Sequence, residues 1–306
     1  MANTFITPDV IASRALAVLY NTMVLAGLVY RDYDAEFNGQ VGDTISVRTP
    51  TTFTVDEYDR NDGITVQNAT ETSLSVTLDK LLDVSFAVTA EELSLELVSF
   101  DEQLLAPAME AIAQDIDGRL AEQLIDQAEG SHALGPVTGA YLADGSTTQN
   151  LAFRDARKIL SRNKLPLNGR YAVLSPEAVS DILGDELIVQ ADKSGSTDAL
   201  RDASVGRLFG FETYESQVFG YGSGDKGQAD GAAFHRDAVA LVSRALPLPL
   251  DSSGRAAVQS YKGLGLRVVK DYDIDQKQDV VSVDILIGVQ NIRSNAAVQL
   301  TFGQGS

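Results

Sequence analysis

The chain has 306 residues, of which 44% are hydrophobic, enough for about two packed domains, which excludes a disordered protein. Its 43 acidic residues against 24 lysines and arginines give a net charge of −19, and the basic residues are scattered, so we expect no direct binding to nucleic acid. There is no cysteine, which excludes disulfides, thiolate nucleophiles and cysteine-based metal sites.

The N-terminal segment carries a helix signal and no sign of a leader. Residues 1–5 have neither a basic region nor a continuous apolar core, so we expect no signal peptide. The most apolar N-terminal stretch, Leu16–Tyr30, is interrupted by Asn21 and Thr22 and is too short for a membrane span of about 20 residues, and we expect a soluble chain without membrane contact. Thr7 and Pro8 predict the start of an amphipathic helix. The residues leave open whether this helix docks on the chain's own core or elsewhere.

An alternation of apolar and polar residues between residues 41 and 88 predicts half-buried β-strands. The clearest segments are 44–48, 74–78 and 84–88. The turn-rich cluster Asp56–Gly63 lies between the first two and marks the tip of a long two-stranded arm. Because such an arm buries little surface and is marginal in water by itself, the pattern predicts an arm that lies on another copy of the chain.

A long helix follows, predicted from Ser99 to about Glu129 by apolar residues at every third or fourth position. Pro107 favours a kink or a late start within its first turns. Asp117 falls off the apolar stripe, as do Glu110 and Glu122, and we expect these three carboxylates to face away from the core. The stripe consists of Leu105, Met109, Ile112, Ile116, Leu120 and Leu124.

The remaining chain is predicted to consist of short mixed elements followed by long strands. Ser175 and Pro176 have the pattern of an N-cap followed by a proline at the first helical position. The predicted elements are a helix over 149–163, a strand over 170–174, a helix from 175, strands over 209–214 and 238–242, a glycine-rich loop over 220–231, and long strands from about 256 with a turn at 272–278.

The sequence contains no catalytic, cofactor or metal motif. His132 and His235 have no zinc-ligand spacing, and His235 is interpreted as part of a polar turn rather than as a general base. The glycine-rich run 222–228 places Gln228 where a phosphate loop needs lysine. The prediction is therefore a chain without catalytic residues, cofactor or resident metal.

Three aspartates, Asp271, Asp273 and Asp275, occupy positions 1, 3 and 5 of a calcium-loop pattern. Gln276 replaces the turn glycine and Ser282 replaces the bidentate glutamate. A solvated acidic turn is the favoured interpretation, and weak Ca²⁺ or Mg²⁺ binding is the alternative.

Several stretches in collinear order carry a resemblance that covers nearly the whole chain. They are Ala2–Ala12, Leu28–Tyr33, Gly42–Ile45, Leu78–Phe86 with Ala106–Met109, Phe234–Ala238 and Ser282–Gly288. These stretches resemble the major capsid (coat) proteins of tailed double-stranded DNA bacteriophages, specifically the podovirus-type coat proteins.

The resemblance implies an α+β fold, the tailed-phage major capsid protein fold, and a division of the chain. Residues 1–38 would be an N-arm and 39–78 an extended β-hairpin loop. Residues 79–129 and 257–306 would form a peripheral domain with a long spine helix, and 130–256 a mixed α/β axial domain. The best-known relatives carry a large barrel inserted in the axial domain, and 306 residues leave little room for it.

The resemblance also implies a structural function rather than an enzyme. The chain would self-assemble through hexamers and pentamers into the icosahedral capsid of a virion, with a scaffolding protein and a portal as further partners. Packaged double-stranded DNA would be enclosed but not specifically bound, and synthesis and assembly would take place in the bacterial host cytoplasm. The expected contacts between subunits come from the N-arm and the loop tip, at Phe5, Asp56, Glu57, Tyr58, Asp59 and Arg60.

Two alternatives stay open at this point. An encapsulin-type bacterial compartment would keep the fold and hold an enzyme cargo instead of DNA. A metal-dependent hydrolase that uses acids such as Asp271 and Asp273 would belong to a different class altogether.

Overall fold

The computed structural model of the chain describes residues 8–31, 44–49, 55, 72–89, 104–130, 137–138, 150–183, 206–219, 230–249, 255–261, 264–276, 278–293 and 295–301. Its elements in chain order are α1 (Pro8–Thr22), η1 (Leu25–Gly27), β1 (Thr44–Thr49), β2 (Thr72–Thr77), β3 (Lys80–Thr89), α3 (Ala106–Gly130), β4 (Val137–Thr138), α4 (Asn150–Arg162), β5 (Arg170–Leu174), α5 (Pro176–Leu183), β6 (Arg207–Leu208), β7 (Phe211–Glu215), β8 (Gly231–His235), η4 (Arg236–Ala238), β9 (Val239–Arg244), β10 (Ala256–Tyr261), β11 (Leu264–Asp273), β12 (Gln278–Asn291) and β13 (Ala297–Thr301).

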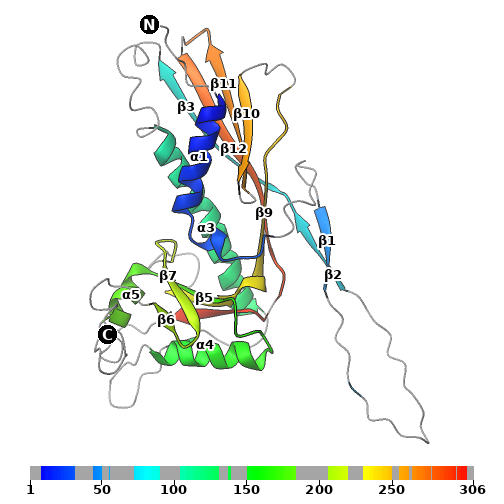
Figure 1. Cartoon of the computed structure of the whole chain (residues 1–306), viewed down its shortest axis with the longest axis vertical. Helices are drawn as coiled ribbons and strands as arrows, with labels where there is room; N and C mark the ends of the chain where they lie inside the picture. The colour runs from blue at the N-terminus through cyan, green and yellow to red at the C-terminus, as the bar shows by residue number, and fades with distance from the viewer. Residues whose placement is uncertain are drawn as a thin grey trace, which may run out of the picture.

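The first sheet has five strands in the order β10-β11-β12-β3, with β9 also paired to β12. Figure 1 shows it as the long upper part of an elongated body. The helices α1 and α3 pack against it and against each other. Alternate residues of β12 are buried in the main core, because only one face of the strand points toward α3. These residues are Val281, Val283, Ile285 and Ile287.

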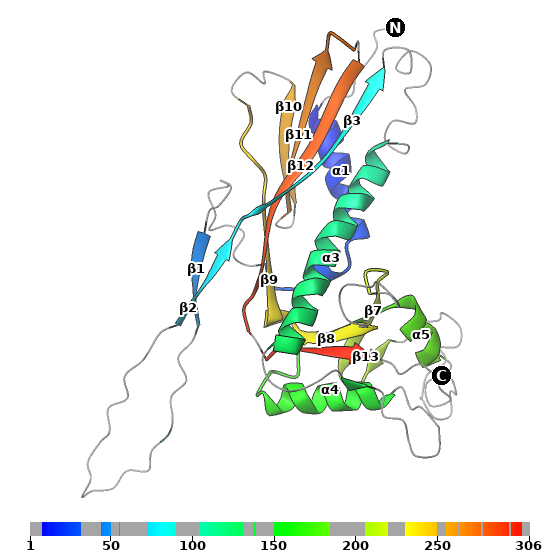
Figure 2. The same cartoon turned by 180° about the vertical axis from the view of Figure 1, so that it is seen from behind.

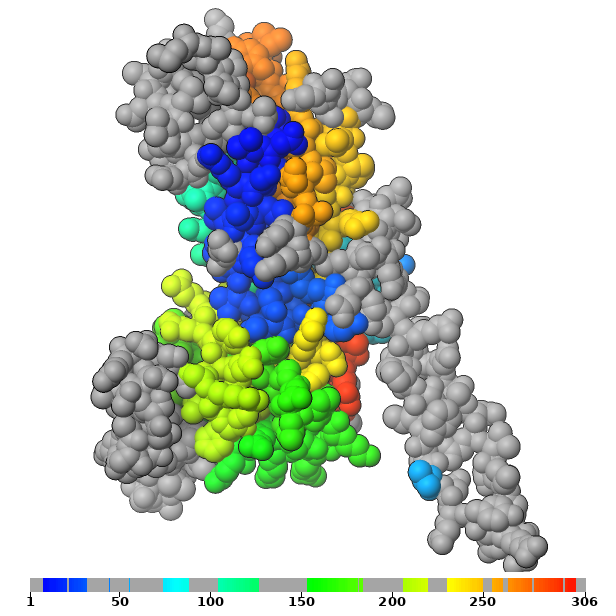
Figure 3. All heavy atoms as spheres, in the orientation of Figure 1, coloured from blue at the N-terminus to red at the C-terminus, as the bar shows by residue number. Residues whose placement is uncertain are grey.

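The N-terminal helix α1 docks on the chain's own core. Ile11, Ala15 and Leu19 are buried, and α1 contacts β10, β11 and α3. Figure 3 shows its atoms, in blue, lying against the C-terminal strands, in orange. After η1, Tyr30 continues this docking by a backbone bridge to β9 beside Ala240. Of the two docking arrangements that the sequence left open, residues 8–31 therefore adopt the one within the chain.

The spine helix α3 begins at Ala106 and ends at Gly130. Residues 99–103, where the predicted helix would start, lie outside the described residues, and the two residues just before Ala106 are π-helical. Pro107 is the second residue of α3, in the first turn of the α-helix, where a proline is tolerated. At 1.5 Å per residue the helix is about 37 Å long. All six residues of its predicted apolar stripe are buried. Figure 2 shows α3 running from the first sheet down to the second.

Asp117 is buried, and the prediction that it faces away from the core is wrong. Its side chain is on the side of α3 that meets η1, and only 4% of the residue is exposed. Its carboxylate accepts hydrogen bonds from the backbone N–H groups of Val24, at 2.8 Å, and Ala26, at 3.2 Å. Burial raises the pKa of Asp117, and these backbone bonds act in the opposite direction. The carboxylate thus fixes the turn after α1 to the spine helix.

Removing the Asp117 carboxylate leaves two backbone donors without their acceptor. We expect Asp117→Ala to lower the free energy of unfolding by about 2 kcal/mol, the usual cost of buried unsatisfied groups. Chemical denaturation followed by circular dichroism measures the change. Glu110→Ala, at an exposed position of the same helix, is the control and should change stability by less than about 0.5 kcal/mol. Equal effects of the two substitutions would contradict the role of Asp117.

The second sheet has six strands in the order β4-β13-β8-β5-β7-β6, and α4 packs against β13 and β8. The predicted N-cap is confirmed, since the hydroxyl of Ser175 accepts a hydrogen bond from the N–H of Ala178 at 3.1 Å. The strand predicted over 209–214 begins instead at Phe211, because Phe209 and Gly210 have φ angles of 48° and 93°. These left-handed residues form the tight turn between β6 and β7.

Two strands, β9 and β13, each belong to the other sheet than the predicted domain division would place them in. β9 lies in the segment expected to be axial and pairs with β12 of the first sheet. β13 lies in the segment expected to be peripheral and pairs with β8 of the second sheet. The division into domains remains a prediction, in which these two strands would be exchanged. The described strands form three open sheets and none of these sheets closes into a barrel.

Candidate functional site

The predicted contact residues of the arm and N-terminus fall outside the described residues. Phe5 and the tip residues Asp56, Glu57, Tyr58, Asp59 and Arg60 belong to this group, and their role stays a prediction. The structure describes the arm at β1, at Val55 and at β2. The candidate site therefore consists of these parts of the arm and of the surface to which the arm is attached.

The arm begins as a two-stranded antiparallel ladder that stands off the body (Figures 1 and 2). Its register runs from Thr44 opposite Thr77 to Thr49 opposite Thr72. Within the described residues, no third strand pairs with either edge of this ladder. Val55, beyond the end of β1, is 99% exposed. A ladder with two open edges presents backbone donors and acceptors that suit pairing with another chain.

The arm is held on the body by a small apolar cluster that is separate from the main core. Val76 and Leu78 contribute from the arm, and Val242 and Leu286 contribute from β9 and β12. All four are fully buried, and Leu246 packs against them. We call these five residues the root cluster. It lies on the outer face of β12, because Leu286 alternates with the core-facing residues of that strand.

Gly288 lies where the arm crosses β12. A Cβ atom at this position would strike the carbonyl oxygen of Thr77 and would lie 3.3 Å from the Cα atom of Leu78. Glycine inside a strand typically marks such a close approach of a second backbone. Gly288 therefore allows the base of β2 to lie directly on the sheet.

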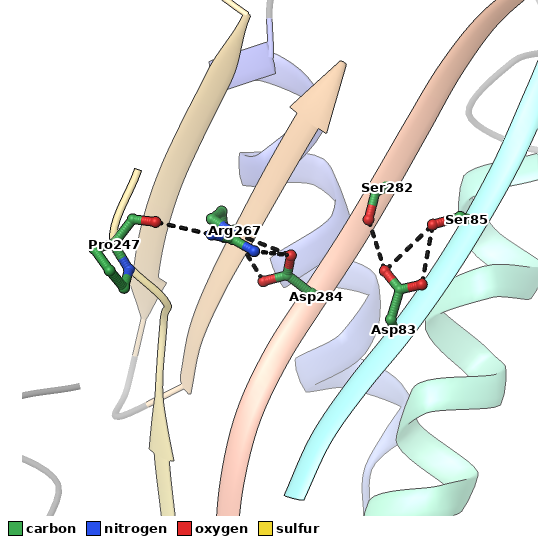
Figure 4. A network of polar contacts seen from close by, with 6 residues as sticks. All are labelled: Asp83, Ser85, Pro247, Arg267, Ser282 and Asp284. Atoms are coloured by element: carbon green, nitrogen blue, oxygen red, sulfur yellow. Dashed lines mark hydrogen bonds and ion pairs between the residues drawn. The ribbon is translucent and has the colours of Figure 1, made fainter. Parts of the chain in front are cut away.

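A polar network extends along the same outer face (Figure 4). Arg267 of β11 faces Asp284 of β12, and Asp284 in turn faces Asp83 of β3. The guanidinium donates to the Asp284 carboxylate, with Nη2 2.7 Å and Nε 3.1 Å from its oxygens. Asp83 accepts a hydrogen bond from Ser282 at 2.6 Å and another from Ser85. Burial raises the pKa of Asp284, Arg267 lowers it, and the neighbouring Asp83 raises it further.

The one described histidine has a structural position. His235 is buried, its Nε2 lies 3.0 Å from the carbonyl oxygen of Asn168, and its Nδ1 accepts from the N–H of Asp237. Burial lowers the pKa of His235, although Asp237 and the Asn168 carbonyl raise it. A neutral imidazole with both nitrogens engaged fits the predicted polar turn and leaves no nitrogen for a substrate. His132 and the glycine run 222–228 lie outside the described residues.

The acidic turn after β11 has the geometry of a solvated turn. Asp271 pairs with Arg255 at 3.0 Å, and both side chains are mostly exposed. Asp273 accepts hydrogen bonds from the backbone N–H groups of Asp275 and Gln276. Among the described residues, no three potential ligands come together in an arrangement that could hold a metal ion. None of the described helices combines the length and apolar character of a membrane span.

Sequence reasoning placed the functional surface at the arm tip and missed its root. Gly288 stands in the last of the long strands predicted after residue 256, and this isolated glycine in a strand is the signal that points to a close backbone contact. Leu286 gives no such signal, because a leucine in a strand is equally consistent with either face. The burial of Asp117 has no local signal either.

Solved structures of phage capsids share the arrangement of these elements. A chain from Mycobacterium phage Che8 matches with a TM-score of 0.65 at 21% identity, with 92% of this chain and 91% of that chain covered. The capsid structure of the cyanophage P-SCSP1u matches with a TM-score of 0.67 at 12% identity, covering 92% and 89% of the two chains. The mature capsid of bacteriophage PhiM1 matches with a TM-score of 0.61 at 16% identity, covering 86% and 83%.

The likeness at these identities is one of fold. No family model matches the chain, and no curated protein matches its sequence. The structural matches cover most of both chains. The predicted fold class is thereby confirmed: the chain has the α+β fold of phage capsid proteins.

Proposed function

We propose that the chain is a major capsid protein that self-assembles into the icosahedral shell of a virion around packaged DNA. The observation that carries the proposal is the two-stranded ladder, which leaves a body with the phage capsid fold and pairs with no third strand among the described residues. The matched structures support the fold. The arm supports self-assembly, because its strands can pair with another copy of the chain.

The physical basis is the marginal stability of a two-stranded arm. The ladder lies on the sheet at its root, through Val76 and Leu78. Two strands that extend beyond such a support are marginal in water, so this part of the arm gains stability when it lies on another subunit. Main-chain pairing at an open edge and burial of alternate side chains are the forces available to it. Each contact is weak, but many contacts per subunit in a closed lattice add up. The net charge of −19 suits an inner surface that must enclose DNA without binding it.

The finer assignments belong to the same proposal. The lattice is built from hexamers and pentamers of this chain, with a scaffolding protein and a portal as partners, and assembly takes place in the cytoplasm of the bacterial host. Phe5 adds a contact from the N-terminal segment to a neighbouring subunit. The chain carries out no chemistry, in line with the arrangement of His235 and the acidic turn around Asp273.

Electron microscopy and sedimentation of the expressed chain test this function directly. We expect closed shells or ring-shaped capsomers, either from the chain alone or on co-expression with the proposed scaffolding protein. Shells that contain an enzyme in place of DNA would favour the encapsulin-type compartment. A compact monomer under every condition, scaffold included, would contradict both shell functions.

The charges at the arm tip are proposed to set the register of its contact. Neutralising them in the triple variant Asp56→Asn, Glu57→Gln and Asp59→Asn should slow assembly, because opposite charges guide the approach of two subunits. Surface charges are screened over about 8 Å at physiological salt, so the difference from the unsubstituted chain should shrink as salt is added. Light scattering at a series of ionic strengths measures both effects.

A control with the same change of net charge separates register from overall repulsion. The exposed body carboxylates Glu110, Glu177 and Glu215 are replaced by glutamine. This control should leave the rate of assembly unchanged or raise it slightly. Slowing of the same size in both variants would show that the tip charges have no special position.

A further inference from the structure

The arm meets the described body along one narrow line, at the end of β2. Among the described strands β1 pairs with β2 alone, and β2 reaches β3 after only Leu78 and Asp79. Lys80, the first residue of β3, is already in register with Ile287 of β12. The path of the arm is therefore fixed within a few residues, where Thr77 lies against Gly288.

A second backbone segment, the chain after β9, lies on the same outer face of the first sheet, beside the base of the arm. The chain that leaves β9 crosses β11 so closely that a Cβ atom on Gly265 would lie 2.5 Å from the backbone nitrogen of Ala245. Arg267, held by Asp284, donates to the carbonyl oxygen of Pro247 at 2.8 Å. Figure 4 shows this contact beside the ion pair. Leu246 lies between these two anchored residues, which explains how it reaches the root cluster.

We propose that Gly288 and the root cluster form a latch that sets the direction in which the arm leaves the body, and that assembly depends on this direction. Gly288 and Val76 are positioning residues that act through the arm. This inference rests on the proposed capsid function for its second half, while its first half concerns the free subunit alone.

The length of the arm makes its direction sensitive to the root. The six paired residues of β1 and β2 span about 20 Å at about 3.3 Å per residue. A rotation of about 10° at Gly288 then moves the far end of this ladder sideways by about 3.5 Å, which is most of the distance of about 4.8 Å between neighbouring strands of a sheet. A displacement of this size takes the edge of the arm out of hydrogen-bonding distance of a neighbouring strand. A small disturbance at the latch thus prevents the arm from pairing with a neighbour.

The latch is also separable from the stability of the body. Val76, Leu78, Val242 and Leu286 belong to a cluster of their own and not to the main core. Changing the arm side of this cluster removes no contact from the core between α3 and the first sheet. The two effects can therefore be measured independently.

A distance measurement on unassembled subunits tests the first half of the proposal. The chain has no cysteine, so spin labels attach only at cysteines introduced for Val55 on the arm and Gln114 on an exposed position of α3. Pulsed electron paramagnetic resonance then gives the distribution of distances between the label on the arm and the label on α3. We expect Gly288→Ala to shift the mean of this distribution by about 3 Å or to broaden it by a similar amount, which is the displacement that a rotation of about 10° produces over the length of the ladder.

Gly231→Ala is the matched control. A Cβ atom there would lie 2.5 Å from the carbonyl oxygen of Val173, which is the same kind of clash placed inside the second sheet. Gly231→Ala should lower the melting temperature without changing the distance between the two labels. Val76→Ala is a second, milder variant that can be used if Gly288→Ala does not fold. It removes only two methyl groups from the root cluster. It should broaden the distribution and leave the melting temperature nearly unchanged.

Assembly of the same variants tests the second half. We expect Gly288→Ala to form about tenfold fewer particles than the unsubstituted chain, because a loss at each subunit is repeated throughout the lattice. An unchanged distance distribution in Gly288→Ala and Val76→Ala, or an equal change in Gly231→Ala, overturns the latch. A changed distribution with full particle yield overturns its link to assembly. Failure of the unsubstituted chain to assemble overturns the proposed function, and the distance measurement still decides the latch.

Discussion

A chain in which the dipeptide Asn-Gly replaces residues 50–71 is expected to fold normally and to form no particles. Thr49 and Thr72 are opposite each other as the outermost pair of the ladder, so two residues suffice to join them. Asn-Gly favours the tight turn whose twist matches a two-stranded hairpin. The root cluster and both larger sheets remain complete, and we expect the melting temperature to stay within about 2 °C of its original value. Loss of the arm tip removes the surface proposed to reach a neighbouring subunit.

A second variant separates the length of the arm from its sequence. Here residues 50–71 are replaced by an equally long chain of glycine and serine, which preserves reach and removes the side chains. We expect this chain to be monomeric as well, because the strand-forming and charged residues of the tip are gone. Electron microscopy and analytical ultracentrifugation compare the two variants with the unsubstituted chain. Shells of ordinary size from the Asn-Gly chain would contradict a role for the arm in assembly.

The sequence was sufficient to predict those elements whose patterns are local. Alternation predicted β1 and β2, and the three-to-four spacing predicted the buried face of α3, because periodicity reflects a single boundary between core and solvent. Ser175 was a correct N-cap for the same reason, since its bond to Ala178 spans three residues. The arm was predictable because an exposed alternating ladder contrasts with the rest of the chain.

Features decided by distant partners were not predictable in this way. Asp117 is buried because η1, more than ninety residues earlier, presents N–H groups to it. β13 pairs with β8 in a different sheet from β12, and a strand pattern does not identify its neighbour. For Pro107 the sequence allowed either a kink or a late start, and only the fold shows that the α-helical part begins one residue before it. Gly288 carried a usable signal, but the identity of the backbone that lies on it required the fold.

Removal of Arg267 is expected to cause the largest loss of stability among single substitutions on the outer face. Its side chain is 19% exposed and that of Asp284 is 5% exposed, so the pair is largely shielded from water. Breaking a buried pair from one side leaves an uncompensated charge, which typically costs about 3–5 kcal/mol. Arg267→Ala also releases the carbonyl of Pro247. Urea denaturation monitored by circular dichroism measures the change in unfolding free energy.

Two further variants identify the buried charge as the cause. Arg267→Met combined with Asp284→Leu removes both charges and keeps the volume, and it should recover most of the lost stability. Arg255→Ala breaks the exposed pair with Asp271 and should cost no more than about 1 kcal/mol. A double variant as unstable as Arg267→Ala would mean that packing, not charge, accounts for the loss.

The pH dependence of the stability loss in Arg267→Ala is an independent test of whether the charge of Asp284 causes it. Burial and Asp83 already raise the pKa of Asp284 above that of an unfolded chain, and Arg267 opposes them. Without Arg267 the pKa of Asp284 in the folded chain rises further, so the folded state binds a proton more readily than the unfolded state. A group with a raised pKa contributes stability that is present at low pH and is lost as pH rises through its folded value. The deficit of Arg267→Ala relative to the unsubstituted chain should therefore shrink as pH is lowered from neutrality, and a deficit that stays constant with pH would place the lost interaction elsewhere than at Asp284.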